Sequence, residues 1–537
     1  MLRPSLLRRQ PCFSPASFCR DSFCSLRASS MNRRLLLQTA LALLLCALGY
    51  YLAHRESYEV HAVLASAGGC QMATDIYEPR SGTPVGSVVL FHGLAANKKV
   101  MAFNAQEFAN QDLRVFVPDL PGHGRTPGPY SPDRDDSCAL AFVRDLAARK
   151  AIIPERTILS GHSLGAAIAI RAASHFPVAG VIAFSPAPMQ TTAGFSAEMI
   201  PFHDVLPLPP HSLLLTGQWE PGPIKALAQQ LVATAADSSS MYQMIPTTTH
   251  VSILFSAQTF AQLRAWTAQI LGTNPEAPFP KTMPALACIL GLIGLAILVP
   301  PFLHEMNVSC KTNSPVAAPA QLASTGIYLR GLWTILLASF AVMLLLTTGH
   351  VPFHFVRIFQ CDYLGVFLFF SGIAALAATY KLLPPWSAFC NVPALSATAS
   401  AIVITFLFAA WFELTFYEAW LNPARWSRFP LLFLLLLPAH LAEELFLGEP
   451  RTSPNRARIL KAFGLRAAAV AALSVGIFTL HSGEILFALL SSYFVVFSLL
   501  QRLACDLVRF RTQSPAATAI FGAILLAAFA LAIFPVA

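Results

Sequence analysis

The second half of the chain is a succession of apolar segments. Most approach twenty residues, the length that an α-helix needs to cross ~30 Å of hydrocarbon. Only 12% of all residues are charged, against about 25% in soluble domains. The sequence therefore predicts a membrane domain of about eight helices over residues 284–537. The segments are 284–303, 327–347, 362–380, 397–420, 429–447, 467–481, 484–501 and 516–536. The sixth and seventh are short and almost continuous, so they could also form a single crossing.

Another apolar segment, residues 35–53, lies near the N-terminus. It is long enough to span a bilayer. No small-residue cleavage site follows it directly, which favours a retained anchor over a cleaved signal peptide. The preceding residues 1–34 hold seven arginines and one acid, Asp21, and a basic flank of this kind is typical of the cytoplasmic side. We expect a basic cytoplasmic tail, although Met31 could equally be the natural start. The arginines are Arg3, Arg8, Arg9, Arg20, Arg27, Arg33 and Arg34.

Most of the net charge of +9 comes from the basic flank of the first apolar segment, because residues 1–34 alone supply +6 (seven arginines less one aspartate). We therefore expect no nucleic-acid partner. Further basic residues gather in 448–466 and 502–511, which we expect to be loops. Nine successive crossings place both stretches on the side of the N-terminal tail and residues 57–272 on the other. The prediction is an integral protein of a bacterial-type inner membrane, with residues 57–272 on the non-cytoplasmic side.

Residues 57–272 have a different pattern. Short β-rich runs alternate with helix-length stretches and are separated by Gly and Pro turns. The first two runs predict an antiparallel start, and the later ones a mostly parallel, doubly wound sheet. This predicts an α/β domain with its own core. The expected strands are 58–64, 71–77, 87–91, 114–117, 157–160, 178–184, 212–216 and 242–245.

The strongest chemical signal in this domain is Gly161-His162-Ser163-Leu164-Gly165. A β-rich run leads into it and a helix-forming run follows. A nucleophile on a tight strand-to-helix turn needs small neighbours, because the backbone there is strained and crowded. The N-terminus of the next helix then lies near the place where an oxyanion develops. The pattern predicts that Ser163 is a nucleophile.

The segment resembles the nucleophile elbow of the α/β-hydrolase superfamily. Residues 88–94 (VVLFHGL) resemble the strand and His-Gly turn that supply half of the oxyanion hole in that family. Residues 117–125 (VPDLPGHGR) resemble its next strand and Gly-His-Gly loop. This motif is most similar to that of the monoglyceride-lipase and lysophospholipase-like branch. The resemblance covers residues 57–272. It implies a serine esterase or lipase with a catalytic triad in the order Ser, acid, His.

The resemblance assigns the remaining site residues. Glu220 follows the strand at 212–216, where the family usually has Asp, and His250 follows the last strand as the general base. The oxyanion donors would be the backbone N–H groups of Leu94 and Leu164. Glu198 and Asp204 are the rival carboxylates. His92 and His123 are expected to pack loops rather than to react.

The expected function is hydrolysis of carboxylic acyl esters, lipid-derived, through a Ser-His-Glu triad and an acyl-enzyme. Only about twenty residues lie between Pro188 and Pro210, where a large lid would sit, so the site should be comparatively open. The partners are an acyl-ester or lipid substrate and the bilayer. The alternatives are an acyltransferase that uses the same nucleophile, and a transporter or scaffold with an accessory exported domain.

No cofactor or metal is expected. The eleven cysteines form no CxxC pair and no zinc-like cluster. Cys70 and Cys138 are the two that fall in the α/β domain, and their spacing does not say whether they pair. Glu443-Glu444 with His481 resembles in part the site of intramembrane metal-dependent proteases, but Gly448 stands where that family has Arg. Helix packing is the plain alternative. No family is recognised for the membrane domain.

Overall fold

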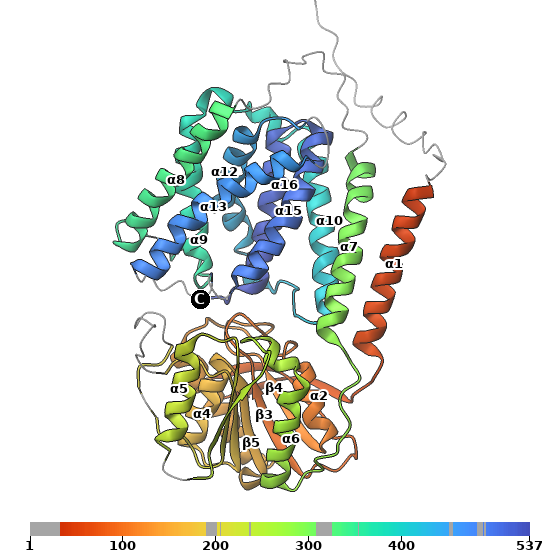
Figure 1. Cartoon of the computed structure of the whole chain (residues 1–537), viewed down its shortest axis with the longest axis vertical. Helices are drawn as coiled ribbons and strands as arrows, with labels where there is room; N and C mark the ends of the chain where they lie inside the picture. The colour runs from red at the N-terminus through yellow and green to blue at the C-terminus, as the bar shows by residue number, and fades with distance from the viewer. Residues whose placement is uncertain are drawn as a thin grey trace, which may run out of the picture.

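The computed structural model describes most of the chain beyond the N-terminal tail. The described residues are 33–189, 201–204, 206–235, 238–307, 325–352, 354–450, 455–480, 487 and 490–537. They form a sheet domain over residues 57–272 and a helical half over residues 284–537, which lie one above the other (Figure 1). A single long helix, α1 (Arg33–His54), precedes the sheet domain.

The sheet domain is built on eight strands in the order β1-β2-β4-β3-β5-β6-β7-β8. β1 pairs antiparallel with β2, and β2 antiparallel with β4, whereas every later pairing is parallel. Each predicted strand is found, and the predicted α/β fold class is confirmed. The strands are β1 (Val60–Ala67), β2 (Cys70–Tyr77), β3 (Gly86–Phe91), β4 (Leu113–Pro118), β5 (Thr157–His162), β6 (Gly180–Phe184), β7 (Ser212–Gly217) and β8 (Met241–Ile245).

Helices cover both faces of this sheet. α3, α4 and α5 share one core with the side chains of Val89 and Leu159, and α2 and α6 share the other with Val88 and Ile158. Adjacent strand residues point to opposite faces, so nearly continuous apolar strands feed both cores. The helices are α2 (Ala102–Asn110), α3 (Pro132–Ala148), α4 (Leu164–His175), α5 (Gly222–Ala233) and α6 (Ala257–Leu271). A disulfide between Cys70 and Cys138 joins β2 to α3, with the Cα atoms 5.7 Å apart.

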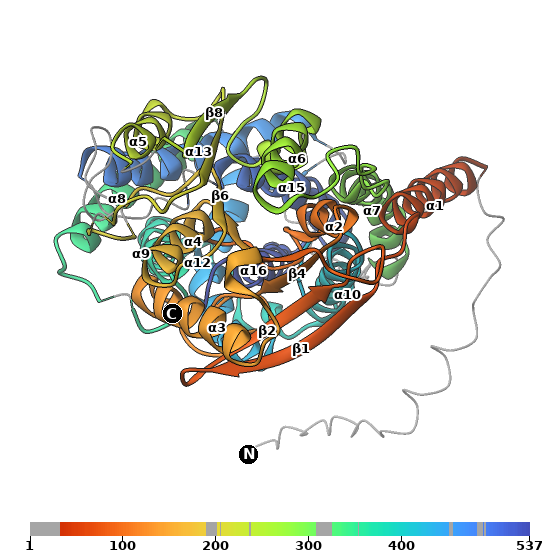
Figure 2. The ribbon, with the colours of Figure 1, turned by 90° about the horizontal axis from the view of Figure 1, so that it is seen from below.

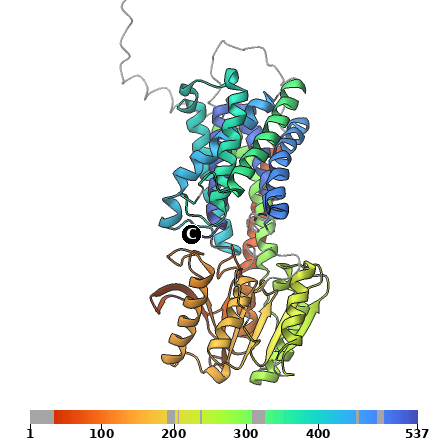
Figure 3. The same ribbon diagram turned by 90° about the vertical axis from the view of Figure 1, so that its left-hand side faces the viewer.

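The helical half is a bundle of long helices that stands on the sheet domain (Figure 3). Seen from the side of the sheet domain, α1 stands at the edge of this bundle beside α7 (Figure 2). The long helices of this half are α7 (Pro284–Asn307), α8 (Thr325–Thr347), α9 (Cys361–Ala378), α10 (Val392–Thr415), α12 (Phe429–Leu447), α13 (Arg456–Thr479), α15 (Ser491–Thr512) and α16 (Pro515–Ile533), with the short α11 (Pro423–Trp426) between α10 and α12.

Eight helices of the described residues are long and apolar enough to cross a membrane. They are α1 and all the long helices of the helical half except α15. The protein therefore has the composition of a membrane protein. The charged residues of α15 are Arg502, Asp506, Arg509 and Arg511.

Two expectations about loops were wrong. Residues 456–466 belong to α13 and residues 502–511 to α15. Their arginines are tolerated in helices because carboxylates of neighbouring turns and helices pair with them. Arg458 lies 2.6 Å from Glu444, and Arg502 lies 2.6 Å from Glu443. The sequence predicted loops here because basic residues are dense in both stretches. The glutamates that pair with them come from α12 and are not visible from the local sequence.

The two ends of the bundle differ in their contacts. At the end facing the sheet domain, Asn422 Nδ2 donates to the Gly124 carbonyl at 3.3 Å. The N–H of Val536 donates to the Gly122 carbonyl at 2.9 Å, and the Tyr130 N–H donates back to the Val536 carbonyl at 2.6 Å. The last turn of α15, which holds Arg509 and Arg511, and the start of α16 lie at the opposite end (Figure 1). The loop after β4 is therefore held by the helical half.

Candidate active site

Ser163 occupies the turn between β5 and α4 with φ 55° and ψ −115°, a left-handed backbone that a side chain rarely adopts. Its N–H donates to the Phe184 carbonyl at 2.9 Å, and its own carbonyl accepts from the Ala187 N–H at 3.0 Å. Strand β6 and the residues after it thus hold the strained turn in place. The side chain is half-buried at the carboxyl end of β5.

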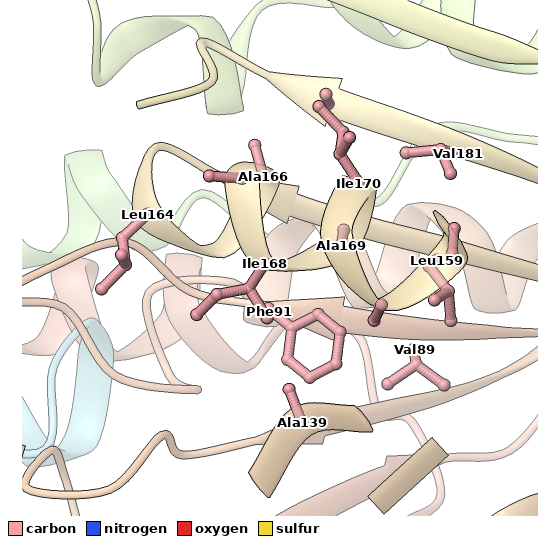
Figure 4. Packing of buried hydrophobic residues seen from close by; sticks show 14 of the residues in the cluster. Val89, Phe91, Ala139, Leu159, Leu164, Ala166, Ile168, Ala169, Ile170 and Val181 are labelled. Carbon is pink, nitrogen blue, oxygen red and sulfur yellow. The ribbon is translucent and has the colours of Figure 1, made fainter. Parts of the chain in front are cut away.

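Two glycines make this turn possible. A Cβ on Gly161 would lie 2.2 Å from the Gly165 carbonyl oxygen, and one on Gly165 would lie 2.4 Å from the Phe91 carbonyl oxygen. Behind the turn, the small and branched side chains of α4 pack against Phe91 of β3 and Val181 of β6 (Figure 4). The strand–turn–helix context that the sequence suggested is therefore present, and its glycines are required by space.

Glu220 and His250 lie together after β7 and β8. Glu220 Oε2 is 3.3 Å from His250 Nδ1, and the Glu220 side chain is fully buried while that of His250 is 20% exposed. Glu220 Oε1 accepts from the Gly217 N–H at 2.6 Å and from the Ser185 hydroxyl. The carboxylate is thus fixed by its own turn and by the end of β6, with one oxygen left for the imidazole.

His162 ties the loop of His250 to the elbow. Its Nε2 lies 2.7 Å from the His250 carbonyl oxygen, so this ring nitrogen carries the proton and donates. Burial, with His250 beside it, lowers the pKa of His162 to about 3, which keeps the ring neutral. His162 is adjacent to Ser163 in sequence, and this bond brings the His250 segment against the nucleophile turn. Sequence reasoning missed both His162 and Ser185, since neither stands at a patterned position.

The two expected oxyanion donors lie on either side of the elbow. Leu164 is the first residue of α4, where backbone N–H groups have no partner within the helix. Leu94 follows β3 and belongs to a turn closed by the bond from the Ala96 N–H to the Gly93 carbonyl at 3.1 Å. A Cβ on Gly93 would lie 2.9 Å from His162 Nδ1, so this turn passes directly beside the elbow.

His92 and His123 hold backbone groups. His92 Nε2 accepts from the Leu120 N–H at 3.0 Å, and its Nδ1 lies 2.8 Å from the Gly93 carbonyl. His123 Nε2 accepts from the Ala95 N–H at 3.4 Å. Burial lowers the pKa of His92 to about 4 and lowers that of His123 well below its usual value, so both rings are neutral. They connect the loops that follow β3 and β4.

The rival carboxylate Asp204 is not part of this group. Asp204 lies 2.6 Å from Arg171 on the outside of α4, and this hydrogen bond to the guanidinium lowers the pKa of Asp204. Glu198, like most of the expected short cap, lies outside the described residues. Among the described residues, no cluster of three or more His, Cys, Asp or Glu side chains could hold a metal ion. Glu443 and Glu444 instead pair with arginines, and His481 lies outside the described part of the chain.

Residues 88–354 match the family described as "Alpha/beta hydrolase family". This chain contains an α/β-hydrolase domain. The match runs beyond α6, the last helix over the sheet, into the first helices of the helical half. No curated protein matches the sequence. The identification rests on the family match and on the strand order of the hydrolase domain.

Several solved structures resemble the hydrolase domain. A predicted CIB-like hydrolase from Thermoplasma acidophilum is 20% identical, covers 40% of this chain and 100% of its own, and has a TM-score of 0.31. The carboxylesterase EstE1, cloned from a metagenomic library, is 15% identical over 44% of this chain and 97% of its own, with a TM-score of 0.33. A monoacylglycerol lipase from Paleococcus ferrophilus is 18% identical over 37% of this chain and 98% of its own, with a TM-score of 0.31.

Proposed function

We propose that the protein is a membrane-anchored serine hydrolase that cleaves carboxylic acyl esters. The observation that carries this proposal is the pairing of the buried Glu220 carboxylate with His250, whose segment is bonded to the residue beside Ser163. A buried acid that accepts from Nδ1 leaves Nε2 of the imidazole free to take a proton. The strained turn at Ser163 is the place where a hydrolase of this fold presents its nucleophile.

The roles follow from the positions. Ser163 Oγ attacks the ester carbonyl carbon while His250 takes the hydroxyl proton, and Glu220 stabilises the imidazolium. The N–H groups of Leu94 and Leu164 receive the oxyanion. The bond to the alcohol then breaks, and His250 returns the proton to that alcohol. Water attacks the acyl-enzyme by the same steps in reverse and releases the acid.

A lipid-derived ester is the substrate class we favour. The sequence of residues 117–125 is similar to the corresponding motif of the monoglyceride-lipase and lysophospholipase-like branch, and the cap between Pro188 and Pro210 is short. The loops after β3 and β4 also face the helical half, whose helices have the length and composition of membrane spans. An acyl chain in the adjoining bilayer would need to travel little to reach this end of the sheet.

We place the hydrolase domain on the non-cytoplasmic side. The first turn of α13 and the last turn of α15, at the far end of the bundle, each hold two arginines, as the positive-inside rule predicts for a cytoplasmic end. The Cys70–Cys138 disulfide supports the same orientation, because disulfides persist in oxidising compartments.

The proposal is tested with the purified full-length protein, an active-site-directed fluorophosphonate and a series of acyl esters of increasing chain length. Ser163→Ala should abolish labelling and lower the rate of hydrolysis by about 10⁴-fold or more. Ser160→Ala, three residues earlier and within β5, is the matched control and should keep both. Activity of Ser163→Ala within about tenfold of wild type would contradict the proposal. Product analysis with an added alcohol distinguishes hydrolysis from acyl transfer.

A further inference from the structure

The turn that carries Leu94 is contacted by the segment that follows α10 of the helical half. The Tyr417 hydroxyl donates to the Ala95 carbonyl at 2.9 Å, and a second carbonyl, that of Ala532, lies further away at 3.3 Å. Leu94 and Ala95 also pack into an apolar cluster formed otherwise by the helical half. The proposed oxyanion turn is therefore supported from outside the hydrolase domain.

Ala95 needs such support. Its φ is 59°, in the left-handed region that a residue with a Cβ adopts only when its surroundings hold it there. Both of its backbone polar groups are bound, the N–H by His123 Nε2 at 3.4 Å and the carbonyl by the Tyr417 hydroxyl. The first contact comes from the hydrolase domain and the second from the helical half.

A second contact secures the next part of this loop. The Lys98 N–H donates to Asp119 Oδ1 at 2.7 Å, and its ammonium lies 3.2 Å from Asp119 Oδ2 and forms an ion pair with Glu418. Burial alone would lower the pKa of Lys98, but these carboxylates and Asp75 raise it, so the ammonium keeps its charge. Asn97 Nδ2 also reaches the Glu418 carbonyl at 3.4 Å. Tyr417 and Glu418, which are consecutive in the helical half, thus bind this loop at Ala95 and at Asn97–Lys98.

We propose that Tyr417 is a positioning residue for ester hydrolysis, through which the helical half sets the oxyanion turn of the hydrolase domain. This inference rests on the proposed function, because it assigns the Leu94 N–H to the oxyanion. An oxyanion donor works only when it is held at hydrogen-bond distance from the place where the charge develops. Without the Tyr417 hydroxyl, the Ala95 carbonyl loses its partner and the strained turn loses one of its two supports.

The test compares Tyr417→Phe with wild type in the full-length protein, using an acyl ester and its thionoester, in which sulfur replaces the carbonyl oxygen. Sulfur accepts hydrogen bonds poorly, so a thionoester gains little from the oxyanion donors. Complete loss of one donor costs about 10²–10³-fold in kcat. We expect a displaced donor to lower kcat for the ester by about tenfold, with KM within about twofold and thionoester turnover nearly unchanged.

The matched control is Tyr328→Phe. The Tyr328 hydroxyl also donates to a backbone carbonyl of the helical half, that of Lys461 at 3.2 Å, but at the far end of the bundle. Tyr328→Phe should leave the ratio of ester to thionoester turnover at the wild-type value. An equal loss for both substrates in Tyr417→Phe, or no loss, would overturn the inference while Ser163→Ala still tests the proposed function. An ester hydrolysis that survives Ser163→Ala would instead reject the function itself.

Discussion

Replacing Glu220 by glutamine changes one atom of a fully buried side chain. In the wild type, Oε1 accepts from the Gly217 N–H and the Ser185 hydroxyl, and Oε2 faces His250 Nδ1. The amide oxygen of glutamine must take the place of Oε1, because an NH₂ group there would face the Gly217 donor and leave it unpaired at a cost of about 1–3 kcal/mol. The NH₂ group then faces His250.

This orientation imposes the wrong tautomer on the imidazole. Nδ1 has to accept from the amide, so the proton moves to Nε2, the nitrogen that should take the proton from Ser163. A change of this kind costs about 10⁴-fold in kcat, which is about 5 kcal/mol at 1.36 kcal/mol for each factor of ten. The bond to the Gly217 N–H is kept, so the fold should be retained.

The assay is steady-state hydrolysis of the best acyl ester, with the amount of folded protein matched by size-exclusion chromatography. Asp204→Asn is the control, since Asp204 pairs with Arg171 on the outside of α4, and Glu198→Gln is the second. Both should stay within about threefold of wild type, which is less than 1 kcal/mol. The reasoning fails if Glu220→Gln retains more than a tenth of the wild-type kcat, or if either control is the crippling change.

Two further predictions concern the orientation and the disulfide. Reporters that are active only after export should be active when fused after Thr273 or within 421–428, and inactive within 451–455; the reverse pattern would show the opposite orientation. Replacing Cys70 and Cys138 by serine should destabilise the hydrolase domain by about 2–4 kcal/mol and lower its thermal midpoint by about 5–15 °C. Wild type in strong reductant should behave in the same way, and an unchanged midpoint would show that the bond does not form.

The sheet could be predicted from the sequence because its signals are local. Each strand is a short apolar run between turn residues. The nucleophile elbow is recognisable from Gly161 and Gly165, since no residue with a Cβ fits at either position. The resemblance to the α/β-hydrolase superfamily assigns Glu220 and His250 from their order after strands, and the structure brings these two side chains together. The assignment of the triad to a reaction remains a prediction.

What could not be predicted depends on distant partners. Arg502 of α15 indicated a loop because nothing in the sequence shows that it pairs with Glu443 and Glu444 of α12. The bond of His162 to the His250 carbonyl comes from a position that the elbow pattern leaves free. The contact of Tyr417 with Ala95 joins residues more than three hundred positions apart. Such contacts appear only when the helices are packed.

The contact of Val536 with the Gly122 loop constrains the order in which the protein is assembled. Ribosomes add about 5–20 residues per second, so Val536 is made tens of seconds after Gly122. The strands of the hydrolase domain can pair during that interval, since their partners all precede residue 250. The Gly122 carbonyl must wait for the Val536 N–H and the Arg425 guanidinium, which lies 3.1 Å away. The loop after β4 is therefore completed only once α16 has been synthesised and docked.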